Sequence, residues 1–191
     1  MNYWLWALSL ASAPALVVLA TLAARIALRT LQAAEHTAQE TRKSVEKLDL
    51  SLRVDVILRL DERFNAPALL QARVKAARCY LYRDPVHPPS EVDDIFDFFS
   101  MLGLLLEEGA LDERLTYAFF FAWILHYVIA FEAYVLACRL HEPAVWRNVR
   151  RLFDRLLEVE CKKAQLPREA VIPDGAALEK WFEEEAALLS S

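Results

Sequence analysis

The N-terminal segment restricts what this chain can fold into more than any other feature, because its first 24 residues carry no charged side chain. About 20 predominantly apolar residues are enough for one helix to cross the hydrocarbon core of a bilayer. A cleaved signal peptide would begin with basic residues and contain a shorter apolar run. A helix lying in the plane of the membrane would need a polar face, which this segment lacks. We therefore expect residues 1–24 to form a single transmembrane anchor.

The charged residues around this segment predict its orientation. No Lys or Arg precedes it, whereas Arg25 and Arg29 follow it before the first acidic residue, Glu35. Basic residues that flank a span favour the cytoplasmic side of the membrane. We expect a single-pass membrane protein with its N-terminus outside the cell and its C-terminal domain in the cytoplasm.

The composition after the anchor indicates one all-α domain. The chain has 191 residues but only three glycines, and its eight prolines lie mainly between long uninterrupted segments. This pattern favours helices over strands and tight turns. The net charge of −5 gives no broad basic surface for nucleic acid. The three cysteines are widely spaced and are expected to be reduced thiols, as is usual in the cytoplasm.

Residues 25–63 contain neither Pro nor Gly, so the anchor helix is expected to continue as a helical stalk. Apolar and small residues recur there in the heptad pattern of a coiled coil, and this seam consists of Leu31, Ala34, Ala38, Thr41, Val45, Leu48 and Leu52. Two interpretations stay open. Either the seam pairs two copies of the chain, or one amphipathic helix packs against its own domain.

The remaining chain is expected to form a compact bundle of about five helices over residues 64–164, then a linker and a short acidic C-terminal helix over residues 165–191. Pro, Gly and capping residues place one helix between Pro67 and the loop at residues 83–90. Further helices are expected at residues 91–107, from 112 to about 140, from 143 to about 164, and at 174–189. Ser90 with Asp93 is expected to form a capping box, and Asp112 to cap the following helix. The aromatic stretch from Leu115 to Ala137 is expected to be a buried core helix and not a second span.

Two polar residues interrupt this aromatic stretch, and both are candidate site residues. His126 is expected to be a partly buried, hydrogen-bonded core residue. Glu132 needs a partner such as an arginine on a neighbouring helix, because an isolated buried carboxylate is costly. The two residues lie six positions apart, so they face different directions and are not expected to act as a pair. A functional polar pocket around them is the alternative.

Arg147, Arg151 and Arg155 lie on one face of the next expected helix. This row is a candidate for contact with anionic lipid headgroups. The favoured interpretation is a solvated face with ion pairs one helical turn apart, namely Arg150–Asp154 and Arg155–Glu158.

Two further groupings have the residue types of metal or catalytic sites. Asp93, Asp94 and Asp97 carry the oxygen ligands that divalent metals prefer, but the helix dipole also favours acidic residues in the first turn of a helix. Cys138 and His141 can meet at a helix end, but a structural zinc site needs four ligands. We therefore expect capping and surface roles here, and no catalytic residue, metal or cofactor.

Several short motifs follow one another from Arg53 onward: an arginine-rich approach to Phe64-Asn65-Ala66, then Ala72-Arg73, Asp94 to Phe99 with Leu102-Gly103, Glu108 to Asp112, and an aromatic helix from Tyr117 to Tyr127. In these motifs the chain resembles a bacterial family known as domain of unknown function 4760. Tyr127-Val128 departs from the Tyr-Trp pair expected there. The resemblance implies a membrane-tethered helical domain of bacteria and carries no catalytic residues to transfer.

The anchor, the stalk and the scarcity of catalytic motifs predict a non-enzymatic interaction or sensor/scaffold module at the bacterial inner membrane. Its expected contacts are the lipid bilayer and either a protein partner or a second copy bound through the stalk, with no nucleic acid. The alternative function is a phage-defence or stress effector that acts at the inner membrane itself.

Overall fold

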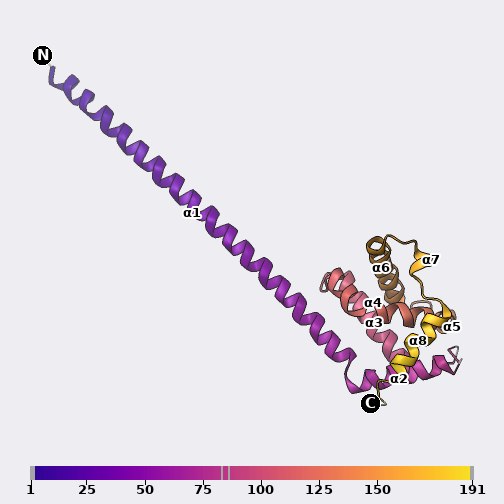
Figure 1. Ribbon diagram of the computed structural model, residues 1–191. Coiled ribbons are helices and arrows are strands. Elements are labelled where there is room, and N and C mark those ends of the chain that lie inside the picture. Colours follow the sequence, from indigo (N-terminus) through magenta and orange to yellow (C-terminus); the bar gives the residue numbers. More distant parts are fainter. Residues whose placement is uncertain (1–2, 83, 86, 190–191) are drawn as a thin grey trace. The chain divides into compact units, whose positions relative to one another are not determined.

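The computed structural model describes residues 3–82, 84–85 and 87–189, and the side chains of these residues from Thr21 onward except at position 26 (Figure 1). The described residues contain helices and no strand, which confirms the all-α fold. The helices are α1 (Tyr3–Phe64), α2 (Pro67–Leu81), α3 (Glu91–Glu107), α4 (Glu113–Ala130), α5 (Glu132–His141), α6 (Arg147–Ala164), α7 (Arg168–Val171) and α8 (Gly175–Ala186).

The chain divides into two compact units, residues 1–51 and residues 52–191. The first unit is the N-terminal part of α1, and its described side chains are all exposed, including those of the heptad seam from Leu31 to Leu48. The predicted anchor, residues 1–24, lies almost entirely outside the residues whose side chains are described, and it stays a prediction. Among the residues whose side chains the structure describes, no single helix has the length and apolarity to cross a membrane, whereas α4 and α5 meet that criterion together as a pair bent by 69°.

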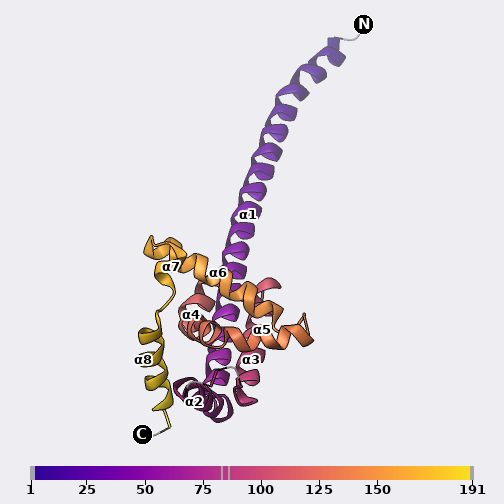
Figure 2. The same ribbon diagram turned by 90° about the vertical axis from the view of Figure 1, so that its right-hand side faces the viewer.

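The second unit is a helical bundle with an aromatic core. The last turns of α1 contribute the buried side chains of Ile57, Leu60 and Phe64, and the Phe64 ring stacks on Phe98 of α3 with centroids 4.9 Å apart. α2 packs against α3 and α8, and α6 packs against α3 and α4. Figure 2 shows the chain returning from α6 through α7 to α8, which reaches α2. The end of α1 and the C-terminal helix therefore join one core.

The expected single helix from Asp112 to about Leu140 is wrong, because the chain bends at Phe131 between α4 and α5. Phe131 has φ −109° and ψ 19°, and its side chain is fully buried. The bend directs α5 so that the Tyr134 hydroxyl donates a hydrogen bond to Asp93 of α3 at 2.7 Å. Burial of one ring and this contact between helices stabilise the bend without any Pro or Gly. The expected core burial applies to α4, whereas α5 contains no buried residue.

α6 begins at Arg147 and not at Pro143, where the sequence predicted its start. Trp146 adopts a left-handed backbone conformation with φ 46° and ψ 33°. Its buried indole donates to the Asp97 carboxylate at 2.8 Å, and the Arg139 guanidinium donates to the Trp146 carbonyl oxygen at 2.9 Å. These contacts stabilise a backbone conformation that is costly for a large residue.

The two predicted N-terminal caps have different outcomes. Asp112 caps α4 as expected, because its carboxylate accepts a hydrogen bond from the backbone N–H of Leu115 at 3.0 Å. The capping box at Ser90 is wrong, since Ser90 has helical backbone angles and its side chain forms no cap. Asp93 instead accepts the Tyr134 hydroxyl, so a contact with α5 replaces the local one.

Candidate functional site

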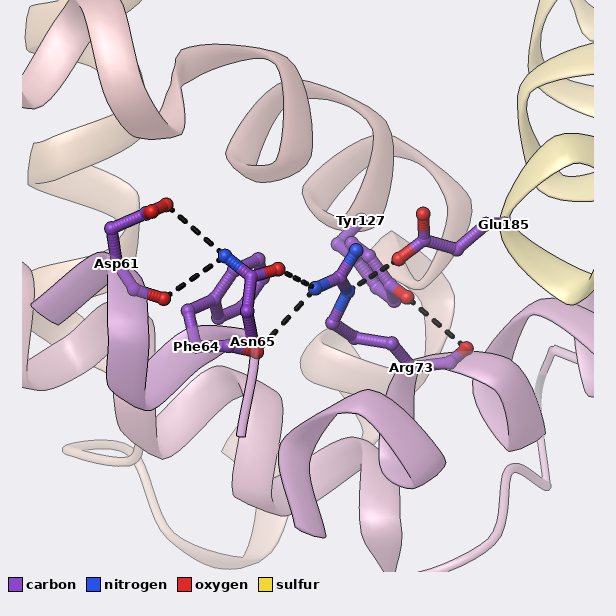
Figure 3. A network of polar contacts seen from close by, with 6 residues as sticks. All are labelled: Asp61, Phe64, Asn65, Arg73, Tyr127 and Glu185. Carbon is purple, nitrogen blue, oxygen red and sulfur yellow. Dashed lines mark hydrogen bonds and ion pairs between the residues drawn. The ribbon is translucent and has the colours of Figure 1, made fainter. Parts of the chain in front are cut away.

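A buried polar network surrounds Arg73 of α2 (Figure 3). Its Nε donates to Glu185 of α8 in an ion pair whose side chains are 2% and 8% exposed. Its Nη1 donates to the Asn65 amide oxygen at 3.0 Å and to the Phe64 carbonyl oxygen at 3.4 Å. A buried charge is tolerated when a counter-charge and hydrogen bonds satisfy it. One guanidinium therefore connects the end of α1 with α8.

The end of α1 is fixed by the same guanidinium. The guanidinium carbon lies 4.5 Å from the ring centroid of Phe64 and 5.3 Å from that of Trp123, which are favourable cation–π distances. The Asn65 amide nitrogen donates to the carbonyl oxygen of Asp61 at 3.0 Å. A cation near the last carbonyl groups of a helix also interacts favourably with the helix dipole. Arg73 thereby stabilises the position at which α1 stops.

Tyr127 of α4 completes the network (Figure 3). Its hydroxyl donates to the backbone carbonyl oxygen of Arg73 at 3.2 Å. Burial is the main reason why the pKa of the Tyr127 hydroxyl lies well above its usual value, with the Glu185 carboxylate adding to the effect. The hydroxyl therefore stays protonated and acts as a hydrogen-bond donor. The network thus contains a cation, an anion and neutral groups supplied by α1, α2, α4 and α8.

A cluster of rings continues the contact between α8 and α4. The Trp181 ring stacks on His126 with centroids 4.4 Å apart and planes 7° apart. His126 Nδ1 lies 2.6 Å from the carbonyl oxygen of Ala122, so the ring donates its proton there. Burial lowers the pKa of His126, against the smaller opposing effects of this hydrogen bond and of Glu185. His126 is therefore the partly buried, hydrogen-bonded residue that the sequence predicted, and it contacts α8.

Glu132 has the arginine partner that the sequence led us to expect. Its carboxylate lies 3.7 Å from Arg150 of α6, but its side chain is 62% exposed. Because His126 contacts α8 and Glu132 contacts α6, the two residues do not share a pocket. The pair is a surface contact between helices.

The arginine row of α6 contacts two neighbouring helices. Arg151 pairs with Glu107 of α3 at 3.1 Å, and Arg155 pairs with Glu113 of α4. Arg147 is exposed. The local pair between Arg150 and Asp154 is confirmed at 3.0 Å, whereas the pair expected for Arg155 is replaced by the longer-range one. Two members of the row therefore fasten α6 to the bundle.

Two of the three clustered aspartates also accept hydrogen bonds from other parts of the chain. Asp93 accepts from Tyr134 and Asp97 from Trp146. In the part of the chain that the structure describes, no group of three His, Cys, Asp or Glu side chains could hold a metal ion. Asp94 and Asp97 line an open surface cleft of about 450 Å³ between the end of α1, α2 and α3, together with Arg63 and Met101. The cleft is lined by acidic and basic side chains.

Sequence reasoning missed the Arg73 network, although helical spacing contains the signal for it. Arg73 lies on the same helical stripe as the apolar residues Leu70, Val74 and Ala77, and this spacing predicts a buried face. A charge on a predicted core stripe requires a counter-charge. Glu185 satisfies that need from a helix 112 positions away in sequence, and nothing in the sequence indicates that these two stripes meet.

A family model described as Domain of unknown function (DUF4760) matches residues 14–156. The match includes Arg73 and Tyr127 but ends before α8. No curated protein and no solved structure matches the chain.

Proposed function

The chain belongs to the family described as Domain of unknown function (DUF4760), and we propose that it is a membrane-anchored helical interaction or sensor/scaffold module that works without catalysis. In this proposal residues 1–24 span the bacterial inner membrane once. The N-terminus lies outside, and the bundle lies in the cytoplasm. The partners are the lipid bilayer and a protein or a second copy of the chain.

One observation carries the proposal: the helix that begins in the predicted anchor ends inside the core of the second unit. α1 is continuous from Tyr3 to Phe64. The Phe64 side chain is 0% exposed, and its carbonyl group accepts a hydrogen bond from Arg73. A change at the end of α1 therefore alters the packing of α2 and α8 directly. Such a connection suits a module that relates the state of a membrane segment to the surface of a cytoplasmic domain.

The use of the acidic side chains supports a non-catalytic role. Asp93, Asp97 and Glu185 each accept a hydrogen bond from a residue on another part of the chain, namely Tyr134, Trp146 and Arg73. Carboxylates engaged in this way stabilise the arrangement of helices. These three carboxylates are thus engaged in structural contacts.

A proximity-labelling enzyme fused to the C-terminus of the full chain tests the proposal in the bacterium that encodes it. We expect labelling of a defined set of cytoplasmic and inner-membrane proteins. This set should differ from those obtained with the free labelling enzyme and with the same fusion lacking residues 1–24. Labelling of periplasmic proteins, or a set equal to that of the free enzyme, would contradict the proposal.

The alternative, a phage-defence or stress effector acting at the membrane, is favoured by one observation. α4 and α5 together have the length and apolarity of a bent membrane span, although the aromatic side chains of Phe120, Tyr127 and Phe131 are fully buried. Loss of membrane potential in cells expressing the chain, measured with a potential-sensitive dye, would favour the effector. An unchanged potential is expected for the interaction module.

A further inference from the structure

α8 is the last helix of the second unit and follows a proline-containing connection. Residues 165–174 precede it and contain Pro167, Pro173 and the four-residue helix α7. The family match ends at residue 156, so α8 lies outside the matched region, whereas α2 and α4 lie within it. α8 packs against these two helices (Figures 1 and 2). The matched domain therefore contains a surface that a separate helix covers.

One face of α8 forms the contact. Leu178, Trp181, Phe182 and Glu185 follow the spacing i, i+3, i+4 and i+7, and Leu178, Phe182 and Glu185 are 6%, 0% and 7% exposed. Glu183 points to the exposed side. This is the pattern of an amphipathic helix that binds in a groove of another protein.

α2 and α4 supply the walls of the groove. The Phe182 ring lies among three rings, with centroid distances of 4.5 Å to Tyr80, 5.4 Å to Tyr127 and 6.2 Å to Phe131. The Arg73 guanidinium contacts Glu185 three residues further along α8. The groove therefore combines an aromatic pocket with a buried cation.

The buried cation makes the groove selective for acidic helices. Phe64 and Asn65 give Arg73 hydrogen bonds but no negative charge, and Glu185 supplies the carboxylate. Leaving such a guanidinium buried without its counter-charge is strongly destabilising. Any helix that occupies the groove must therefore present a carboxylate at the position of Glu185.

Resting on the function proposed above, we propose that α2 and α4 form a helix-binding groove of which α8 is the internal occupant. The partner of this module is then a protein carrying an acidic amphipathic helix, with aliphatic and aromatic residues at i, i+3 and i+4 and a carboxylate at i+7. That helix displaces α8 and pairs its own carboxylate with Arg73.

The tether between α6 and α8 limits how easily an external helix replaces α8. A helix of 12 residues is marginally stable by itself in water, so α8 depends on the groove for its structure. A short linker gives α8 an effective concentration in the millimolar range at the groove. An external helix binds only in competition with this tethered one. Because few grooves are empty at any moment, the apparent affinity of the external helix is reduced in proportion to that small fraction.

The test uses the purified full chain in detergent micelles, with a site for a specific protease inserted after Ile172. Cleavage removes the tether and leaves α8 in the groove as a separate peptide. The probe is a fluorescent peptide of residues 174–189, and its binding is measured by anisotropy. We expect binding to the cut protein to be at least about tenfold tighter than to the uncut protein.

Two peptide variants with the same net charge provide the matched control. Glu183→Lys changes the exposed face, and its affinity should stay within about threefold of the unmodified peptide, as for an exposed charge. Glu185→Lys places a cation against Arg73, and its affinity should fall at least about tenfold. Equal affinities of the two variants, or no binding of the unmodified peptide to the cut protein, would overturn the proposal.

A second measurement needs no cleavage. Phe182→Ala in the uncut full chain weakens the internal helix, so the unmodified peptide should bind this variant more tightly than the wild-type chain. Equal binding would overturn the proposal, as would exchange of α8 between two copies into stable mixed dimers. Neither measurement depends on a membrane or on a cellular partner. A failed peptide experiment therefore leaves the proximity-labelling result, and the function it tests, unaffected.

Discussion

Arg73 and Glu185 are two charged residues that the interior of the bundle accepts because each neutralises the other. The arginine comes from a helix that also contacts the end of α1, and the glutamate comes from the C-terminal helix. Replacing both members of a buried ion pair by apolar residues is often tolerated, whereas removing one leaves an uncompensated charge. The pair should therefore show strong thermodynamic coupling.

This coupling can be measured in residues 52–191, the second compact unit, by urea denaturation. Glu185→Gln is expected to lower the free energy of unfolding by about 3–5 kcal/mol, because it leaves the Arg73 cation buried without a counter-charge. The double variant Arg73→Met/Glu185→Leu is expected to lose less than the sum of the single variants Arg73→Met and Glu185→Leu. Additive losses would mean that the two side chains do not interact.

His126 gives the second unit a predicted dependence on pH. Burial lowers the pKa of His126 in the folded protein below its ordinary value of 6.5, so the unfolded chain binds more protons between these two values. Stability should therefore be complete above about pH 6.5 and decrease as the pH falls towards the lowered pKa. His126→Phe keeps a ring against Trp181 and should reduce the loss of melting temperature between pH 7.5 and pH 5.5.

The exposed His141 provides the control for this experiment. His141→Gln replaces an exposed histidine and should change the difference between the two melting temperatures less than His126→Phe does. A His126→Phe variant that retains the full wild-type difference would assign the pH dependence to other groups.

α3 and α6 approach each other closely at Gly103. A Cβ atom at this position would lie 2.6 Å from the backbone carbonyl oxygen of Asn148. Alanine is the better helix former by about 1 kcal/mol, but a rigid backbone group cannot move away from the added methyl. Gly103→Ala is therefore expected to lower the free energy of unfolding by about 1–3 kcal/mol. Gly175→Ala is the control, because a Cβ atom there meets no atom within 4 Å, and it should not lower the free energy of unfolding. Equal effects at the two glycines would contradict the close packing of α3 against α6.

The heptad seam of α1 supports a prediction about self-association. Val45, Leu48 and Leu52 are 59%, 62% and 58% exposed in the single chain, and pairing two copies would remove them from water. A chain from about residue 26 should be dimeric at tens of micromolar by light scattering, and Leu48→Asp should weaken the dimer. Leu50→Asp is the control, because Leu50 is 59% exposed but lies off the seam. A monomeric parent, or equal effects of the two variants, would exclude a coiled coil.

For the whole molecule, the proposed membrane topology is the testable property. Because Arg25 and Arg29 follow the apolar segment and no basic residue precedes it, the C-terminus is expected in the cytoplasm. Alkaline phosphatase fused there should be inactive, and a fluorescent protein fused at the same place should be bright. Substituting both arginines by Glu and adding Lys residues after Met1 should reverse the two readouts. An active phosphatase on the unmodified chain would invert the assignment.

The sequence by itself determined the helical elements that are bounded by local signals. Pro67 sets the start of α2, and Asp112 caps α4. The helix from Glu91 to Glu107 is also present as predicted, although its expected capping box does not form. These outcomes depend on backbone groups within a turn of the residue concerned, so they can be read from neighbouring positions.

Only the tertiary structure decided those helix ends that depend on contacts with distant segments. The bend at Phe131 and the late start of α6 at Arg147 are stabilised by burial and by hydrogen bonds to α3 and α5. The same holds for the candidate site. Helical spacing places Arg73 and Glu185 on buried stripes, but their pairing depends on how α8 returns to α2. A charge on a buried stripe shows that a counter-charge is needed, but neither segment alone indicates which distant segment supplies it.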